Sequence, residues 1–465
     1  MQSIKNILVL FLGILCFTQV NAQNGNSFKL PAYQKVVLKN GLTVYLMEQH
    51  EVPMINVSVI LPAGAVYDGE QSGLASLTAL ALKHGSANMS KSQTDEALDF
   101  VGATLNTFAA KEYAGINAKF ATKDKDAVLN IIKEVMLNPT FDTTEFNKEK
   151  RRQLVNLEQA KESPGGVIGN YFDMLYYGNN VYANPTSGHV TTITTLTALD
   201  AKKFYSSHYI PNGSAMAVVG DFNTATMKVQ LEILFNPWKK GSAIPVNNTV
   251  INQPATANVL LVNKDDATET TFYIGGPGTQ YNNPDKVAIN LVNTFFGGRF
   301  TSWLNDELRV NTGLTYGARS NFAPLKNAGT FRISTFTANK NTETAIDKAV
   351  EVLNTLHTKG VDANTLTSAK NYEKGQFPPD YETSGQLASL LTEMFWYGFN
   401  ESYINNFEKN IDGLSIETAN QVIKKYFPKQ NLQFVLIGKA SEIRKIAEKY
   451  GKVKEIQLKD DVMKL

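Results

Sequence analysis

Cysteine is almost absent from this sequence: Cys16 is the single one in 465 residues. It lies in an apolar stretch near the start of the chain that we predict is removed on export. The mature chain would then have no thiol, which excludes internal disulfides, a thiolate nucleophile and cysteine metal ligands.

An excess of charge of one sign is also lacking. Lysine and arginine total 45 and aspartate and glutamate total 43, which gives a formal net charge of +2. A nearly neutral chain has no general attraction for nucleic acid or an anionic membrane. With 43% hydrophobic and 19% charged residues, the composition is that of a globular protein. It excludes a disordered chain, a collagen and a coiled coil.

Long hydrophobic runs are absent except at residues 7–17, a stretch too short to span a bilayer. Lys5 precedes this run, and Val20-Asn21-Ala22 follows it with a small final residue that suits a signal peptidase. We interpret residues 1–22 as a secretory signal peptide, so that the mature protein begins at Gln23. The predicted localisation is periplasmic or secreted. An uncleaved membrane anchor is the alternative, and no later segment resembles a transmembrane span.

The usual catalytic motifs are missing as well. None of the five histidines lies three or four residues from another, and neither H-E-x-x-H nor H-x-x-E-H occurs. There is no G-x-S-x-G nucleophile motif, no Walker loop and no G-x-G-x-x-G after a strand. Lone histidines are mostly surface or satisfied core residues, so we assign none of the five to a site.

What the chain does contain is an internal repeat. A strand ending in Phe120 and a strand ending in Phe336 each run into a polar turn and then a helix, 216 residues apart. Two later landmarks recur at offsets of 217 and 218 residues: Tyr209-Ile210-Pro211 with Tyr426-Phe427-Pro428, and the strand 215–220 with the strand 433–438. Three landmarks in the same order at nearly constant spacing predict tandem copies of one domain.

The join between the copies is predicted at residues 236–255. This stretch is rich in proline, glycine and asparagine and has no helical period, as is typical of an interdomain linker. The N-terminal domain would then span residues 23–235 and the C-terminal domain residues 256–465.

Each half mixes strands with runs of helices. Asn40-Gly41 predicts the turn of a hairpin at residues 36–46, and residues 54–61 form a further strand. Residues 73–83 are apolar almost all round, which predicts a buried helix. The expected fold class is α+β: tandem duplicated α/β sandwich domains, each with a mostly antiparallel or mixed sheet covered by helices.

Four groups of residues carry a family resemblance. They are the hairpin and strand that lead to Pro62-Ala63-Gly64-Ala65; Gly73-Leu74-Ala75 with Gly85-Ser86; Asn184-Pro185 to Gly188, residues 208–212 and Gly220-Asp221; and residues 296–302, Leu308-Arg309 and residues 313–316. In these groups, and over nearly the whole predicted mature chain, the sequence resembles the insulinase/pitrilysin and mitochondrial-processing-peptidase family of zinc metallopeptidases.

The departure from the family pattern concerns the zinc helix. Active members bind zinc through the two histidines of H-x-x-E-H, use its glutamate as general base, and add a glutamate from a later helix. Aligned on Gly73-Leu74-Ala75, these positions are degenerate. The first histidine falls on Ser76, the base on Ala79, the second histidine on Leu80 and the later glutamate near Asn156.

Two carboxylates remain near these positions. Glu149 resembles a supporting carboxylate of the family, and Glu158 is an alternative register for the later glutamate. Neither restores the missing histidines. The resemblance therefore implies that this chain has no catalytic residue, metal or cofactor of its own, and that zinc is expected only in a partner subunit.

Arg309 and Tyr316 fit an Arg–Tyr pair of the family. The resemblance implies that such a pair reaches the zinc site of another domain or subunit and binds the substrate backbone carbonyl there. Guanidinium and phenol donors suit that task. The alternative is structural: Arg309 in the last turn of a helix, and Tyr316 as a core aromatic that alternates with Leu314 and Ala318 along a strand.

Two functions follow from these observations. The first is a non-catalytic subunit of a periplasmic zinc peptidase complex, a heterodimer in which Arg309 and Tyr316 contribute to the zinc site of a paralogous partner and bind the peptide substrate. The second is a stand-alone peptide-binding or scaffold protein without catalysis. The presence of the Arg–Tyr pair beside a missing zinc motif favours the first, and a homodimer stays open. No nucleic-acid partner is expected.

Overall fold

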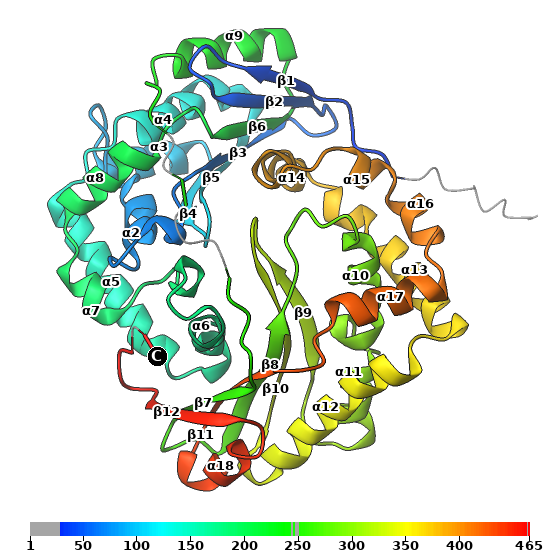
Figure 1. The fold of residues 1–465 in the computed structure, drawn as a ribbon. Helices are drawn as coiled ribbons and strands as arrows, with labels where there is room; N and C mark the ends of the chain where they lie inside the picture. Colours follow the sequence, from blue (N-terminus) through cyan, green and yellow to red (C-terminus); the bar gives the residue numbers. More distant parts are fainter. Residues whose placement is uncertain (1–27, 243–244, 247–250, 463) are drawn as a thin grey trace, which may run out of the picture.

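The computed structural model describes residues 28–242, 245–246, 251–462 and 464–465. The predicted signal peptide, its cleavage point and part of the predicted linker lie outside the described residues. Two six-stranded sheets dominate the described chain, and helices pack against both (Figure 1). The predicted fold class is therefore confirmed. No helix in this part of the chain is both long enough and apolar enough to cross a membrane.

The first sheet has the strand order β1-β2-β6-β3-β5-β4 and is mixed, because β2 and β6 run parallel while the other neighbours run antiparallel. The predicted hairpin is present, with Val36 opposite Val44. Its turn needs glycine, since Gly41 has a φ of 89°. The strands are β1 (Gln34–Val37), β2 (Thr43–Glu48), β3 (Met54–Leu61), β4 (Thr104–Ala109), β5 (Ala114–Ala121) and β6 (Ala215–Gly220).

The second sheet repeats this plan with the order β12-β7-β11-β8-β10-β9. Here β7 and β11 run parallel, as β2 and β6 do. The edge strand beside β7 comes from the end of the chain, whereas its counterpart β1 comes from the beginning. The predicted repeat is thus confirmed in the strand order. The strands are β7 (Asn258–Asn263), β8 (Glu269–Pro277), β9 (Arg319–Pro324), β10 (Gly329–Ala338), β11 (Gln433–Gly438) and β12 (Lys452–Gln457).

The helices also recur in pairs. After Phe120 and Phe336 the chain enters α4 and α12, as predicted. Capping boxes at Ser90, Thr197 and Thr383 fix several helix starts. The helices are α2 (Leu74–Ala81), α3 (Lys91–Phe100), α4 (Lys125–Leu137), α5 (Thr143–Ala160), α6 (Pro164–Tyr177), α7 (Val190–Thr195), α8 (Ala198–His208), α9 (Thr224–Phe235), α10 (Lys286–Asn293), α11 (Trp303–Asn305), α12 (Thr342–Lys359), α13 (Ala363–Gln376), α14 (Ser384–Tyr397), α15 (Ser402–Asn405), α16 (Phe407–Asp412), α17 (Ile416–Tyr426) and α18 (Ala440–Ala447).

The two halves cover each other's sheets. Every residue of the central strands β6 and β11 is buried, so both faces of each sheet must be covered there. One cover is a helix of the other half: α14 packs on β3 and β6, and α6 packs on β8 and β11. Ser58 of β3 lies 3.1 Å from Thr392 of α14, hydroxyl to hydroxyl. At the other crossing, a side chain at Gly275 of β8 would collide with the Phe172 ring of α6.

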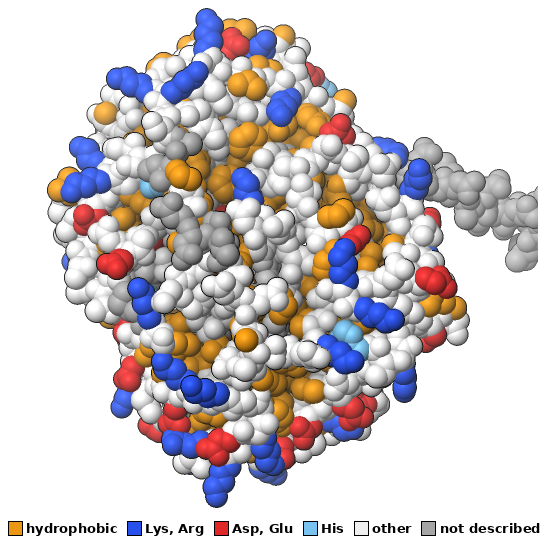
Figure 2. Space-filling model, viewed as in Figure 1, with side chains coloured by type: hydrophobic (Ala, Val, Ile, Leu, Met, Phe, Trp, Pro, Cys, Tyr) orange, Lys and Arg blue, Asp and Glu red, His pale blue; other side chains and the backbone are white. Residues whose placement is uncertain are grey.

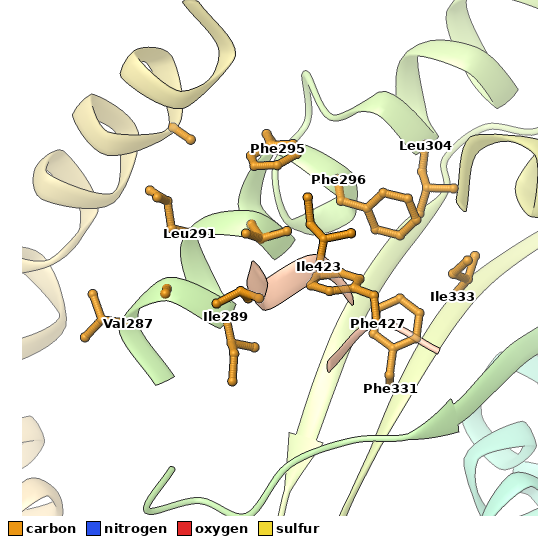
Figure 3. Packing of buried hydrophobic residues seen from close by; sticks show 14 of the residues in the cluster. Val287, Ile289, Leu291, Phe295, Phe296, Leu304, Phe331, Ile333, Ile423 and Phe427 are labelled. Atoms are coloured by element: carbon orange, nitrogen blue, oxygen red, sulfur yellow. The ribbon is translucent and has the colours of Figure 1, made fainter. Parts of the chain in front are cut away.

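The core of the second half is built around Phe427, which belongs to a repeat landmark. Its ring centroid lies 5.2 Å from that of Phe331 and 5.7 Å from that of Phe296. Figure 3 shows these rings between helices α10 and α17 and the strands of the sheet, with Leu304 and Ile333 alongside. Such aromatic packing contributes beyond the area it buries.

Between α9 and β7, the described residues form no helix or strand. The domain boundaries and the linker at 236–255 stay predictions.

His208, at the end of α8, carries a pH effect on stability. Its ring lies between Phe204 and Tyr67, at centroid distances of 4.4 and 4.7 Å, and burial lowers its pKa to about 4. The unfolded chain takes up this proton near pH 6.5, so folding stability is lost as the pH falls from about 6.5 toward 4.

We expect His208→Gln to lose less stability than the parent on acidification from pH 7 to 4.5, by roughly 2–3 kcal/mol. The measurement is the free energy of unfolding by denaturant at both pH values. All other groups titrate in both proteins, so the difference isolates His208. Equal losses in the two proteins would contradict the assignment.

Candidate functional site

The degenerate zinc helix is α2, which is buried as predicted. Ser76 and Leu80 are half-buried and Ala79 is fully buried. The helix is held at its start by Asp68, whose buried carboxylate accepts hydrogen bonds from the backbone N–H groups of Gly73 and Ala75, both at 2.7 Å. Burial raises the pKa of Asp68 to about 7 against the opposing effect of these bonds.

Asn156 lies on α5, which packs on α2. It lines a cavity of about 370 Å³ together with residues of α6 and of the segment that ends the chain, including Asp460 and Asp461. Glu158 does not line this cavity, and its carboxylate pairs with Lys161 at 3.1 Å on the surface. The register that uses Glu158 therefore places the carboxylate away from Asn156.

Glu149 is buried on the same helix. Its carboxylate accepts a hydrogen bond from the Arg152 guanidinium at 2.8 Å and lies 3.8 Å from the His84 ring. The His84 ring and the Arg152 charge hold the pKa of Glu149 below its ordinary value despite burial. A carboxylate engaged in this way supports the helix packing.

The residues at the degenerate positions do not fit zinc. Zinc takes imidazole, thiolate or carboxylate ligands, whereas this set offers one hydroxyl and one amide. Within the described ranges, no three His, Cys, Asp or Glu side chains come together as a group that could hold a metal ion. No zinc-dependent step can be derived for this chain alone.

The second candidate site contains Arg309 and Tyr316. The Arg309 guanidinium carbon lies 4.6 Å from the centre of the Tyr316 ring and 4.8 Å from that of Phe300. Arg309 is half-buried near the end of the π-helical segment Asp306–Asn311, so its predicted place in the last turn is confirmed. Tyr316 is 76% exposed and precedes β9. Its interpretation as a core aromatic on a strand is therefore wrong.

Local hydrogen bonds explain this presentation. The hydroxyl of Thr312 donates to the Glu307 carbonyl at 2.7 Å, which supports the wide turn. The buried side chain of Asn305 then ties the two segments together: its amide nitrogen donates to the Phe300 carbonyl at 2.7 Å and its oxygen accepts from the Ala318 N–H at 3.2 Å. The Arg–Tyr pair thus rests on a fixed support.

A cavity of about 610 Å³ surrounds the pair. Most of its wall comes from the second half, and Gly165, in the first turn of α6, comes from the first half. The lining residues are Gly165, Thr271, Tyr273, Arg299, Phe300, Asn305, Arg309, Tyr316, Gly317, Ala318, Arg319, Ser334, Thr335 and Phe336. On the face seen in Figure 2, charged side chains gather around the rim of the molecule, and hydrophobic side chains concentrate toward its centre.

Sequence reasoning assigned no role to Arg299 or Arg319, which line this cavity with Arg309. A signal was available. Arginine is rare in this chain, with seven residues in all, and three of them fall at 299, 309 and 319.

Comparisons with known proteins agree with the fold. Residues 43–189 match the family model described as Insulinase (Peptidase family M16), and residues 195–372 match the model described as Peptidase M16 inactive domain. A protein of Bacillus subtilis (strain 168), named uncharacterized zinc protease YmxG, is 21% identical over 358 residues, which is 77% of this chain and 86% of that protein.

Two further proteins broaden the comparison. The probable mitochondrial-processing peptidase subunit beta of Arabidopsis thaliana is 20% identical over 281 residues, 59% of this chain and 52% of that protein. The crystal structure of a peptidase M16 inactive domain from Pseudomonas fluorescens superposes with a TM-score of 0.82 at 24% identity, covering 88% of this chain and 98% of that one. The chain belongs to the insulinase/pitrilysin family of peptidases, family M16, as a member without the zinc-binding H-x-x-E-H motif.

Proposed function

We propose that this protein is a non-catalytic subunit of an exported zinc peptidase complex. In that complex a paralogous partner supplies the metal and the base, and this chain supplies Arg309 and Tyr316. The observation that carries the proposal is the exposed Tyr316 ring stacked on the half-buried Arg309, in a chain whose own zinc positions hold Ser76, Ala79 and Leu80. A relative named as a peptidase subunit supports assembly into a complex.

The chemistry assigned to this chain is substrate binding. The partner's zinc would activate water. The Arg309 guanidinium and the Tyr316 phenol would donate hydrogen bonds to the backbone carbonyl oxygen beside the scissile bond, where negative charge develops during hydrolysis. The ring of Tyr316 and that of Phe300 hold the guanidinium, so that its N–H groups are oriented before substrate arrives.

The proposed location is the periplasm or the exterior, after cleavage at residue 22. It depends on the order of Lys5, the apolar run 7–17 and Val20-Asn21-Ala22.

The test is reconstitution. The chain from Gln23 onward, purified and dialysed, should hold no stoichiometric zinc and cleave no peptide, because Ser76, Ala79 and Leu80 offer neither imidazole nor a base. Mixed with a paralogous family member that has an intact H-x-x-E-H, it should form a complex and raise that partner's peptidase activity. One zinc per chain with chelator-sensitive cleavage, or a partner that is equally active alone, would overturn the proposal.

A second function is favoured by one observation. The cavity around Arg309 has walls from both halves of this chain, so the chain itself offers a peptide a concave surface. A stand-alone peptide-binding or scaffold protein is therefore the alternative. It predicts peptide binding without any effect on a peptidase.

A further inference from the structure

The arginines of this protein are unevenly distributed. Lysine and arginine total 45, yet arginine accounts for seven of them, and Arg299, Arg309 and Arg319 line the same cavity of about 610 Å³. They arrive from different elements: Arg299 follows the π-helical segment Thr294–Gly298, Arg309 lies in the next π-helical segment, and Arg319 begins β9. The fold thus brings together side chains that no helical or strand period relates.

These three charges are uncompensated. No aspartate or glutamate lines the cavity, and within the described chain none of the three arginines forms an ion pair. Of the other four arginines, Arg152, Arg332 and Arg444 each pair with a carboxylate, and Arg151 lies on the exposed face of α5. A concave wall of one sign concentrates its field and attracts the opposite charge.

The arginines are held differently, and this leaves N–H groups free for a ligand. The Arg299 guanidinium donates to the hydroxyl of Ser368 at 3.0 Å and, through Nε, to the Thr301 carbonyl at 3.3 Å, and its other terminal nitrogen has no hydrogen bond to the described residues. Arg309 is stacked on Phe300 and Tyr316, and its side chain has no hydrogen bond or ion pair to the described residues. Arg319 is exposed, with no hydrogen bond or ion pair of its side chain to the described residues. Planar guanidinium groups of this kind bind carboxylates through two parallel hydrogen bonds.

The remaining wall suits a peptide. Phe300 and Phe336 are exposed aromatic rings that can contact apolar side chains, and Thr271 and Ser334 add hydroxyls along the sheet. Gly165 has open space where a side chain would be, so α6 leaves this side of the cavity unobstructed.

We propose that this cavity binds carboxylate-bearing peptides, with Arg299 and Arg319 selecting the carboxylate beside the backbone segment that Arg309 and Tyr316 hold. For Arg309 and Tyr316 the inference rests on the proposed function. It adds the class of substrate, which is an acidic peptide. Charge complementarity identifies the occupant: the cavity has three arginines and no acid. The carboxylate can be an Asp or Glu side chain or the α-carboxylate of a peptide end.

The experiment measures peptide binding by the chain from Gln23 onward, without a partner, through fluorescence anisotropy. Three fluorescein-labelled probes of alanine and phenylalanine are compared. The first has one central glutamate and an amidated end, the second has glutamine there and an amidated end, and the third has glutamine and a free carboxylate end. Arg319→Gln and Arg299→Gln are the test variants. Arg151→Gln, on the exposed face of α5, removes the same charge elsewhere and is the matched control.

We expect a probe with a carboxylate to bind about tenfold or more tightly than the fully amidated glutamine probe, as for a charged hydrogen-bonded pair. Arg319→Gln should abolish most of the preference for a carboxylate and leave the affinity for the amidated glutamine probe unchanged. Arg299→Gln should reduce the preference for a carboxylate. Tighter binding of the first probe would identify a side-chain carboxylate as the ligand. Tighter binding of the third probe would identify the α-carboxylate of the peptide end. Arg151→Gln should leave all three affinities as they are.

Equal affinity for all probes, absence of binding, or a preference that survives in both test variants would overturn the proposal. Variants with an unchanged melting transition are compared, so that misfolding does not imitate lost binding. The result is separable from the split-site proposal, because no partner and no cleavage are involved. A preference for acidic peptides without any effect on a peptidase would leave the stand-alone binding function. An effect on the peptidase without this preference would support the split-site proposal and overturn the acidic-peptide proposal.

Discussion

Asp173→Ala should lower the free energy of unfolding by about 3–5 kcal/mol, the range for a buried ion pair that loses one partner. The Asp173 carboxylate, on α6, pairs with Arg332 of β10 and, at 3.0 Å, with Lys111. The three side chains are 12%, 14% and 17% exposed. Removing the carboxylate leaves two nearly buried cations at the contact between the halves. Unfolding in denaturant, with the midpoint and slope compared with the parent, measures the loss.

The matched control is Asp95→Ala. Asp95 pairs with Lys91 at 2.6 Å along α3, but both side chains are 40% exposed, and such a pair contributes less than about 1 kcal/mol. Replacing Asp173, Arg332 and Lys111 together by apolar residues should recover part of the loss, because no unpaired charge then stays buried. A loss for Asp173→Ala no larger than for Asp95→Ala would contradict the assignment of a buried bridge between the halves.

The repeat made most of the fold predictable. Phe120 and Phe336 lie near the ends of the equivalent strands β5 and β10, and the turn at Asn40-Gly41 joins β1 to β2 as expected. These are local signals: turn chemistry, strand periods and helix starts act within a few residues. The reciprocal packing of α6 and α14 was not predictable in this way. An amphipathic helix has the same sequence pattern whether it covers its own sheet or that of the other half.

The candidate site shows the same division. The degenerate positions Ser76 and Leu80 were located through a family resemblance, and the structure places them on one helix beside α5. Tyr316 was open to two interpretations, since alternation with Leu314 and Ala318 is typical of a core strand. In the structure β9 begins after Tyr316, so Tyr316 is not part of a strand and the alternation does not place its ring in the core. The concentration of a rare residue at 299, 309 and 319 marked this segment in the sequence, but the convergence of Arg299, Arg309 and Arg319 on one cavity depends on the tertiary fold.

Arg309→Ala should reduce the peptidase activity of the complex by about 100-fold or more, with Tyr316→Phe reducing it in the same direction. In the proposed complex the partner supplies the metal and this chain supplies the two donors at the substrate carbonyl, and removing one donor that acts on the transition state typically costs that much in rate. The loss should fall on kcat as well as on kcat/KM, because the carbonyl oxygen gains its charge during the reaction.

A structural role for Arg309 and Tyr316 predicts a different outcome, which is lost folding or lost association with the partner. The split site predicts neither loss. The exposed ring of Tyr316 and the stacking of Arg309 on Phe300 make a small contribution to stability, so both variants should keep the parent's melting transition and its association with the partner. Arg151→Gln again serves as the charge-matched control and should leave the rate unchanged. Rates are compared once folding and complex formation are equal. If a folded, fully associated Arg309→Ala complex cleaves peptide at the parent rate, the donors are not at the scissile carbonyl, and the stand-alone binding function replaces the split site.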